Sequence, residues 1–208
     1  MKISYWLYAS LLIVLIAACA PQTIDTADNA QMPNTEVAPS VTATVLTTLA
    51  SAETPMPFEL TSSEFEDGGT IPRDFACTGA NQSPELNWSE PPVGTQSFAI
   101  IFNDPDASSK GFVHWLVYNI PGDARSMPAN VPSNPQIHDS AVHGSNSWGR
   151  TDYGGPCPPE GSTHNYVFSL YALDGMLNLD PGATKDELLA AMEGHVLAEV
   201  KLSAKFSR

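Results

Sequence analysis

Two short stretches of this chain carry most of the side chains that can exchange protons or bind ions. The first, NDPDASSKGFVHW, contains two carboxylates, Asp104 and Asp106, and one imidazole, His114. The second, YGGPCPPEGSTHNY, ends with a second imidazole, His164, and a phenol, Tyr166. Carboxylates accept hydrogen bonds, phenols and charged imidazoles donate them, and imidazoles titrate near neutral pH. If the two stretches meet, they can form a small pocket that binds an anion, a zwitterionic headgroup or a metal ion.

Apolar segments flank both stretches and indicate how they are positioned. Residues 97–102, 115–118 and 167–171 are short runs rich in β-branched and aromatic side chains. Such runs, when bounded by glycine and proline, are typical of buried strands. The polar side chains therefore lie at strand ends, where loops hold functional groups at the mouth of a pocket.

The C-terminal part has the clearest local signals. Thr184 and Glu187 have the spacing of a capping box, and Gly194 suits the stop of a helix of about ten residues. Residues 196–206 then alternate apolar and polar side chains, which predicts a half-buried antiparallel strand. In contrast, residues 122–149 show little periodicity and are expected to be a long loop that carries function or covers a site.

Three spaced motifs follow one another along the chain: Asp104-Pro105-Asp106-Ala107, Gly111-Phe112-Val113-His114-Trp115 and Tyr153-Gly154-Gly155-Pro156-Cys157-Pro158-Pro159-Glu160-Gly161 with His164-Asn165-Tyr166. In this order they resemble the phosphatidylethanolamine-binding protein family, most closely its bacterial Raf-kinase-inhibitor-like branch, and the resemblance extends over residues 58–206. The resemblance implies a mainly β fold of the β-rich α+β class. We expect a central antiparallel sheet, a smaller second sheet and peripheral helices, one of them near the C-terminus.

The resemblance also implies a small anion pocket, which in the family takes phosphate, acetate or a phospholipid headgroup. The side chains that would line it are Asp104, Asp106, His114, His164 and Tyr166, with Phe112 as an apolar wall and Gly155 and Cys157 supplying loop backbone. No cofactor, metal or catalytic residue is implied, so we expect a binding protein and not an enzyme.

The chemistry of these side chains supports such a pocket and indicates how it would hold an anion. Nearby Asp104 or Asp106 would raise the pKa values of His114 and His164, so that charged imidazoles donate to an anion. Anion affinity should then rise as the pH falls through the histidine pKa. The backbone N–H groups of a Gly-Gly pair, here ending in Gly155, could form an anion-binding concavity.

Each of these residues also has a plain structural interpretation. An aspartate beside Pro105 can be an Asx-turn former, His114 a satisfied core histidine and Tyr166 an ordinary strand tyrosine. Only their joint occurrence favours a pocket. A carboxylate–imidazole set could also hold a divalent metal, although no HExxH-like spacing is present.

The sequence departs from the family pattern at three positions. Ser108 stands where many relatives have proline, and Val113 where animal members often have a second histidine. Asn165 stands where arginine is usual in eukaryotic members, which removes a fixed cation from the expected pocket.

The first 56 residues have the composition of an export signal and a tether. Residues 1–18 contain Lys2 and an apolar run too short to span a bilayer, and Ile-Ala-Ala before Cys19 resembles a lipobox. We expect 1–18 to be a lipoprotein signal peptide, Cys19 to be lipidated, and the protein to face outside the cytoplasm in the cell envelope. An ordinary secretory signal, with Cys19 incidental, is the alternative.

Residues 19–56 are rich in Thr, Ala, Pro, Asp and Asn and contain no aromatic side chain. Such a segment buries too little apolar area to offset the entropy of ordering, so we expect a disordered tether before a domain at 57–208. A weak strand or helix within 41–49 is the alternative for that part of the tether.

The two remaining cysteines, Cys77 and Cys157, lie in Gly/Pro-rich loops. Export favours oxidation, so we favour a disulfide between them. Two free thiols are one alternative. The other is a nucleophilic Cys157 activated by His164, as in a thiol hydrolase.

The formal net charge of −14 argues against nucleic acid as a partner, because the long-range field repels polyanions. It does not exclude a local anion site, since salt screens distant charges. The expected partners are thus a small anion or phospholipid headgroup, and the membrane through the lipid anchor. The competing function is a protein-interaction module that inhibits a hydrolase or a signalling partner, and a metal-dependent or thiol enzyme comes third.

Overall fold

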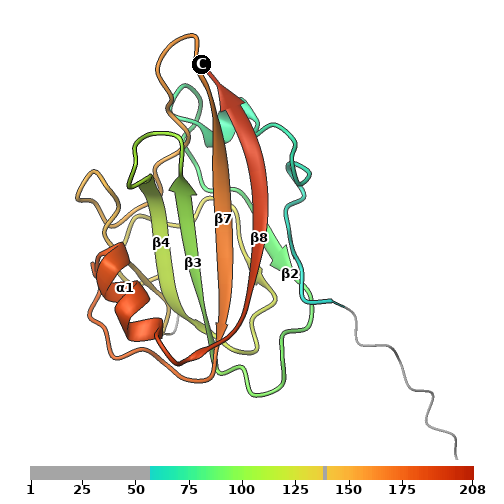
Figure 1. The fold of residues 1–208 in the computed structure, drawn as a ribbon, viewed down its shortest axis with the longest axis vertical. Coiled ribbons are helices and arrows are strands. Elements are labelled where there is room, and N and C mark those ends of the chain that lie inside the picture. Colours follow the sequence, from blue (N-terminus) through green and yellow to red (C-terminus); the bar gives the residue numbers. More distant parts are fainter. Residues whose placement is uncertain (1–56, 138–139) are drawn as a thin grey trace, which may run out of the picture. The chain divides into compact units, whose positions relative to one another are not determined.

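A computed structural model describes residues 57–137 and 140–208. The proposed signal peptide, Cys19, the tether and segment 41–49 lie outside the described residues. Two antiparallel sheets form the fold (Figure 1). The larger has the strand order β6-β4-β3-β7-β8 and the smaller β1-β2-β5. The mainly β class, the two sheets of unequal size and the helix near the C-terminus are confirmed.

The elements follow one another closely along the chain. Their bounds are β1 Leu60–Thr61, a 3-10 turn Arg73–Phe75, β2 Leu86–Trp88, β3 Ser97–Asp104, β4 Phe112–Pro121, β5 Ser126–Met127, β6 Val142–His143, β7 Thr163–Leu173, α1 Lys185–Met192 and β8 Val196–Ser207. Within the described residues, no helix has the length and apolarity needed to cross a membrane.

The central sheet is buried on both faces, which explains the continuous apolar run in β3. Phe98, Ile100 and Phe102 face the small sheet and pack with its buried side chains. Ala99 and Ile101 face the opposite side, where α1 contributes Leu188 and Met192. A strand covered on both sides buries every side chain, so the two-residue alternation disappears from its sequence.

The C-terminal predictions are largely confirmed. Thr184 caps α1, and its side chain and that of Glu187 make both hydrogen bonds of the capping box. Gly194 has a φ of 80°, as expected just beyond the helix, which is eight residues long. β8 alternates along its C-terminal half, where Leu202, for example, is buried and Lys201 exposed.

Two expectations about strand limits were wrong. Residues 122–149 are not a single loop, because they contain β5 and β6, each of two residues. The strands that carry the site also start earlier than their apolar runs: β4 begins at Phe112 and β7 at Thr163. His114 and Tyr166 therefore lie inside strands and not in the loops beside them.

Candidate functional site

The candidate site lies at one end of the central sheet. β3 ends there with Asp104, whereas β4 begins at Phe112 and β7 at Thr163. Antiparallel pairing places Asp104 opposite Phe112 and His164 opposite Phe206 of β8. The C-terminus lies at this same end, at the top of Figure 1. The sheet register thus brings together side chains that are about sixty residues apart, as with the Asp104–His164 pair.

A β-bulge aims His114 into the site. Phe102 pairs with Trp115, but the next residue, Asn103, pairs with Val113, so His114 is an extra residue in β4. Bulges redirect side chains and are frequent next to functional sites. Here the His114 ring lies 5.3 Å from the Phe102 ring and 5.3 Å from the Tyr166 ring, centroid to centroid.

His114 is buried and held in one orientation. The residue is only 3% exposed, and its Nδ1 donates to the Gly154 carbonyl at 2.8 Å. Burial lowers the pKa of His114, and this effect outweighs the nearby Asp104 carboxylate. Asp104 thus acts in the expected direction, but the net pKa of His114 is lowered, so the expectation of a raised pKa was wrong. A neutral ring with its proton on Nδ1 presents Nε2 as an acceptor.

Asp104 serves both as a turn former and as a partner of the site. Its Oδ1 accepts from the N–H groups of Asp106 and Ala107, at 2.9 and 3.0 Å, which is an Asx-type turn. Its Oδ2 accepts from His164 Nδ1 at 2.8 Å. Because Asp104 is only 2% exposed, this carboxylate fixes the His164 ring firmly and leaves Nε2 as the ring nitrogen available for other partners.

Asp106 does not line the pocket, contrary to expectation. Its side chain is exposed, and Oδ2 accepts from Asn165 N at 2.7 Å and from Asn165 Nδ2 at 2.8 Å. These hydrogen bonds lower the pKa of Asp106. Asp106 and Asn165 therefore join the loop after β3 to the start of β7. Asn165 makes this loop contact at the position where the family pattern would place an arginine.

Tyr166 is completely buried, and its hydroxyl lies near the Asp104 carboxylate and the Cys157 backbone without a well-formed hydrogen bond to either. Its ring packs against Phe102 and His114. Among residues 57–137 and 140–208, its Oη is the one buried side-chain polar atom without a hydrogen bond. Burial, with the nearby Asp104 carboxylate, raises the pKa of Tyr166 well above its usual range, so the phenol keeps its proton as a donor. A buried hydroxyl of this kind is costly unless something else occupies the space beside it.

The glycine loop holds the site but offers no free N–H pair for an anion. Gly154 N donates to the His114 carbonyl at 3.0 Å, and Gly155 N donates to Asn81 Oδ1 at 2.8 Å. The expected anion-binding concavity at these two N–H groups was therefore wrong. Both positions need glycine because a Cβ would lie 2.2 Å from the Trp148 ring at Gly154 and 2.2 Å from the Phe75 carbonyl oxygen at Gly155.

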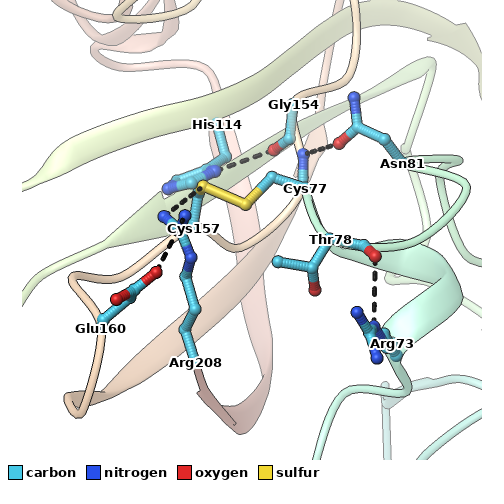
Figure 2. Close-up of a disulfide and its surroundings, with 10 residues drawn as sticks. Arg73, Cys77, Thr78, Asn81, His114, Gly154, Cys157, Glu160 and Arg208 are labelled. Carbon is cyan, nitrogen blue, oxygen red and sulfur yellow. Dashed lines mark hydrogen bonds and ion pairs between the residues drawn. A yellow bond between two sulfur atoms is a disulfide. The ribbon is translucent and has the colours of Figure 1, made fainter.

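The glycine loop ends at a disulfide. Cys77 and Cys157 are bonded, with 80 residues of sequence separation, and Figure 2 shows the bond beside His114 and Arg208. Arg208 donates to Cys157 Sγ at 3.7 Å. A bonded Cys157 is not a nucleophile, so the thiol-hydrolase alternative does not apply to this state.

A pocket of about 340 Å³ opens between these elements. It is lined by Asp104, Ala107, Phe112, His114, Trp148, Cys157, Pro158, Pro159 and His164. Phe112 forms an apolar wall, whereas the expected residues Tyr166 and Gly155 are not part of this lining. A larger hollow, about 440 Å³, lies at the start of α1 between Lys110 and Lys185 and contains none of the expected site residues.

Trp148 is the pocket residue that the sequence reasoning did not identify. Its ring packs edge-on against Phe112 at 4.7 Å and against His114 at 5.1 Å, and it remains 44% exposed at the mouth. It lies in the 122–149 segment, which was expected to cover a site, and a tryptophan within that polar segment was the available signal. No three histidine, cysteine or acidic side chains in the described residues are placed to hold a metal.

Comparison with known proteins shows which proteins this chain is similar to. Residues 61–207 match the family model described as phosphatidylethanolamine-binding protein. A UPF0098 protein of Methanothermobacter thermautotrophicus is 48% identical over 144 residues, which are 69% of this chain and 95% of the relative. A proposed lipoprotein of Mycobacterium tuberculosis, LppC, is 38% identical over 170 residues, covering 81% of this chain and 80% of the relative.

Solved structures give the same result. The Chlamydia trachomatis homologue CT736 superposes with a TM-score of 0.66 at 35% identity, over 73% of this chain and 97% of CT736. YbcL of Escherichia coli superposes with a TM-score of 0.68 at 30% identity, over 73% of this chain and 98% of YbcL. Nearly the whole of each of these two structures thus corresponds to the part described here. The chain belongs to the phosphatidylethanolamine-binding protein family.

Proposed function

We propose that this chain is a lipid-anchored envelope protein that binds, without chemical conversion, a small anion or the phosphorylated headgroup of a lipid in the Phe112–His114–His164 pocket. One observation carries the proposal. Tyr166 Oη is buried without a well-formed hydrogen bond, and the Tyr166 ring packs against His114, which lines the pocket. A ligand oxygen that accepts from this hydroxyl would remove the cost of burying it alone.

The polar groups at the pocket base fit a phosphate that carries one proton. Tyr166 supplies an O–H donor, and His164, held through Nδ1 by Asp104, supplies Nε2–H when it is protonated. His114, whose pKa is lowered, supplies an acceptor at Nε2 for the P–OH group. A hydrogen phosphate both accepts and donates, so it can pair with all three groups.

The wall of the pocket has a different character. Phe112, Trp148, Pro158 and Pro159 present mostly apolar surface. A volume of about 340 Å³ is at the small end of the range for ligand pockets, which suits a phosphate ester with a short carbon arm. Phosphoethanolamine has this form, although the Arg150 guanidinium already lies over the Trp148 ring, 5.2 Å from its centroid.

The anchor is supported by the sequence around Cys19 and by one relative. The lipobox-like Ile-Ala-Ala-Cys order places Cys19 first after cleavage. The Mycobacterium tuberculosis relative also carries a lipoprotein name, and its match covers more of this chain than that of the shorter relatives. Several acyl chains on Cys19 would hold the domain stably at a membrane surface, where phospholipid headgroups are within reach.

The pocket is tested with residues 57–208, because this part corresponds to nearly the whole length of the relatives. Inorganic phosphate and phosphoethanolamine are titrated into the 15N-labelled protein, and backbone NMR shifts are followed. We expect saturable shifts around His114 and Tyr166, lost in His114→Ala. His195→Ala is the matched control, since His195 pairs with exposed Asp174 outside the pocket.

The outcomes separate the alternatives. Saturable shifts that survive in His195→Ala and vanish in a folded His114→Ala establish the pocket, and the difference between the two ligands then measures the contribution of the ethanolamine arm. Absence of shifts in the wild type at millimolar ligand would reject the anion pocket and favour the protein-interaction function.

The anchor needs a separate experiment with the full chain. Cells that express the wild type or Cys19→Ser are fractionated after incorporation of a labelled fatty acid. We expect label and membrane association in the wild type and neither in Cys19→Ser. Equal membrane association of the two proteins would reject lipidation at Cys19.

A further inference from the structure

The Cys77–Cys157 disulfide is part of the wall of the ligand pocket. Cys157 lines the pocket and is partly buried, whereas Cys77 lies on the exposed side of the same bond. A solvent-accessible disulfide that borders a binding site is accessible to a reductant without unfolding of the protein.

The disulfide also fixes the loop that orients His114. Cys77 N donates to the Pro156 carbonyl at 3.1 Å, so the turn at Cys77 contacts the loop next to the bond itself. Two residues earlier in the loop, Gly154 accepts from His114 Nδ1 and donates to the His114 carbonyl. Figure 2 shows Gly154 between His114 and the segment that carries Cys77 and Asn81.

We propose that the Cys77–Cys157 disulfide is a redox control of this pocket: the oxidised protein binds the anion tightly, and the reduced protein binds it weakly. The proposal rests on the anion-binding function proposed above. Two consequences of reduction act in the same direction, since the loop behind His114 loses its covalent tie and a sulfur that can ionise is left in the pocket wall.

The chemical step is thiol–disulfide exchange with a dithiol reductant. One thiolate of the reductant attacks the exposed Cys77 sulfur, the Cys77–Cys157 bond breaks, and Cys157 leaves as a thiolate. The second thiol of the reductant then displaces Cys77, so the reductant ends as a disulfide and the protein has gained two electrons. The two protons of the reductant pass to Cys77 and, where it is protonated, to Cys157, and otherwise to solvent.

The surroundings of Cys157 contain charges of both signs. Arg208 donates to its sulfur at 3.7 Å and is itself paired with Glu160 at 3.9 Å. An adjacent guanidinium favours the thiolate of a reduced cysteine. The titratable and charged groups around Cys157 are Arg208, Glu160, His114, His164, Asp104 and Tyr166.

A thiolate at this position adds negative charge to the wall of a pocket that takes an anion. This charge weakens anion binding, and it disappears when the thiol is protonated. The affinity difference between oxidised and reduced protein should therefore grow as the pH rises.

The test uses residues 57–208 and inorganic phosphate, with calorimetry or NMR as the readout. Four samples are compared at pH 6 and pH 8.5: the oxidised wild type, the wild type reduced with dithiothreitol, Cys77→Ser, and Cys77→Ser/Cys157→Ser. We expect the reduced wild type and Cys77→Ser to bind phosphate about tenfold more weakly than the oxidised protein at pH 8.5. The double variant, which cannot ionise there, should lie between them and the oxidised protein.

Linkage supplies an independent readout. If phosphate binds the oxidised form tenfold more tightly, saturating phosphate must make the disulfide harder to reduce by the same factor, about 30 mV for a two-electron couple. Equilibration in dithiothreitol redox buffers with and without phosphate, followed by thiol quantification, measures this shift. A shift in the expected direction that is absent with equal chloride supports the proposal.

Failure of the redox control can be distinguished from failure of the anion-binding function. If the oxidised protein binds phosphate and the reduced protein binds it equally well at pH 8.5, the redox control is overturned and the pocket stands. If the oxidised protein does not bind phosphate, the binding function fails and the control fails with it. Circular dichroism of the reduced samples shows whether a lost affinity reflects unfolding, in which case the specific control is also overturned.

Discussion

Two hydrogen bonds join His114 and Gly154. The His114 side chain donates from Nδ1 to the Gly154 carbonyl at 2.8 Å, and the Gly154 N–H donates to the His114 carbonyl at 3.0 Å. The side-chain bond selects the tautomer, and the backbone bond fixes the distance between β4 and the glycine loop. The His114 imidazole is therefore held in one orientation with Nε2 as an acceptor, while Asp104 holds the ring of the other pocket histidine, His164.

Replacement of Tyr166 by phenylalanine should separate binding from stability. The Tyr166 hydroxyl is buried without a well-formed hydrogen bond, so its removal should raise the free energy of unfolding of the ligand-free protein by about 1 kcal/mol. The same change should weaken phosphate binding about tenfold, the value of one good hydrogen bond. Urea unfolding and phosphate titration measure the two effects.

Tyr153→Phe is the matched control for this experiment. The Tyr153 hydroxyl is also buried but donates to the Phe75 carbonyl at 2.8 Å. Its removal should lower the free energy of unfolding by about 1 kcal/mol, because the carbonyl loses its partner. If Tyr166→Phe destabilised the protein as much as Tyr153→Phe does, the Tyr166 hydroxyl would have a structural partner and the argument for a ligand there would fail.

The fold could be predicted where packing produces a recognisable pattern of apolar and polar residues in the local sequence. β3 is buried on both faces and reads as a continuous apolar run, whereas β8 alternates because its outer side chains meet solvent. β5 and β6 could not be predicted, since two residues show no period and these strands form through pairing with distant partners. The early start of β7 was hidden because its first three side chains, Thr163, His164 and Asn165, are polar, and that of β4 because His114 interrupts its apolar run.

The site was predictable in its residue types but not in its hydrogen bonds. Asp104, His114 and His164 do converge. The partner of Asp106, however, is Asn165, and that of the Gly155 N–H is Asn81, both of which depend on contacts between segments about 60 and 74 residues apart. The direction of the His114 pKa also depends on burial, which the neighbouring carboxylates in the sequence do not reveal.

Gly154→Ala should disturb the pocket mouth through Trp148. The new Cβ would lie 2.2 Å from the Trp148 ring, which is half exposed and can move outward. We expect a stability loss of about 1–3 kcal/mol from this overpacking, a shift in tryptophan emission and several-fold weaker phosphate binding. Gly175→Ala is the control, because no atom lies within 4 Å of a Cβ there. Unchanged emission in Gly154→Ala would show that Trp148 is not displaced.

Asp106→Ala should loosen the loop after β3 without removing a pocket side chain. The change deletes the acceptor of both Asn165 donors, so the Asp104–Ala107 turn loses its tie to β7. We expect phosphate affinity to fall roughly two- to fivefold, in line with a lost exposed hydrogen bond. Asp106→Asn keeps an acceptor oxygen and should retain most of the affinity. Equal losses in the two variants would point to the charge of Asp106, and not the tie, as the cause.

His143 gives the fold a sensitivity to acid that is separate from ligand binding. It is fully buried, accepts from Trp115 Nε1 at 3.0 Å and donates from Nε2 to the Pro132 carbonyl at 3.0 Å. Burial lowers the pKa of His143, as it does that of His114. Because the unfolded histidines take up protons near pH 6.5 and the folded ones only at lower pH, the stability they contribute is complete above about pH 6.5.

The stability must then fall as the pH is lowered from about 6.5 toward the folded pKa values, by at most about 1.4 kcal/mol per pH unit for each histidine. A glutamine in place of His143 can accept from Trp115 through its carbonyl oxygen and donate to Pro132 through its amide, so His143→Gln should keep both contacts without titrating. Urea unfolding at intervals from about pH 8 to pH 5 should show the wild type losing stability below about pH 6.5 roughly twice as steeply as His143→Gln, with both curves flat above about pH 7. Parallel curves would mean that the pKa of His143 is not lowered in the folded protein, and the proposed acid sensitivity would be rejected.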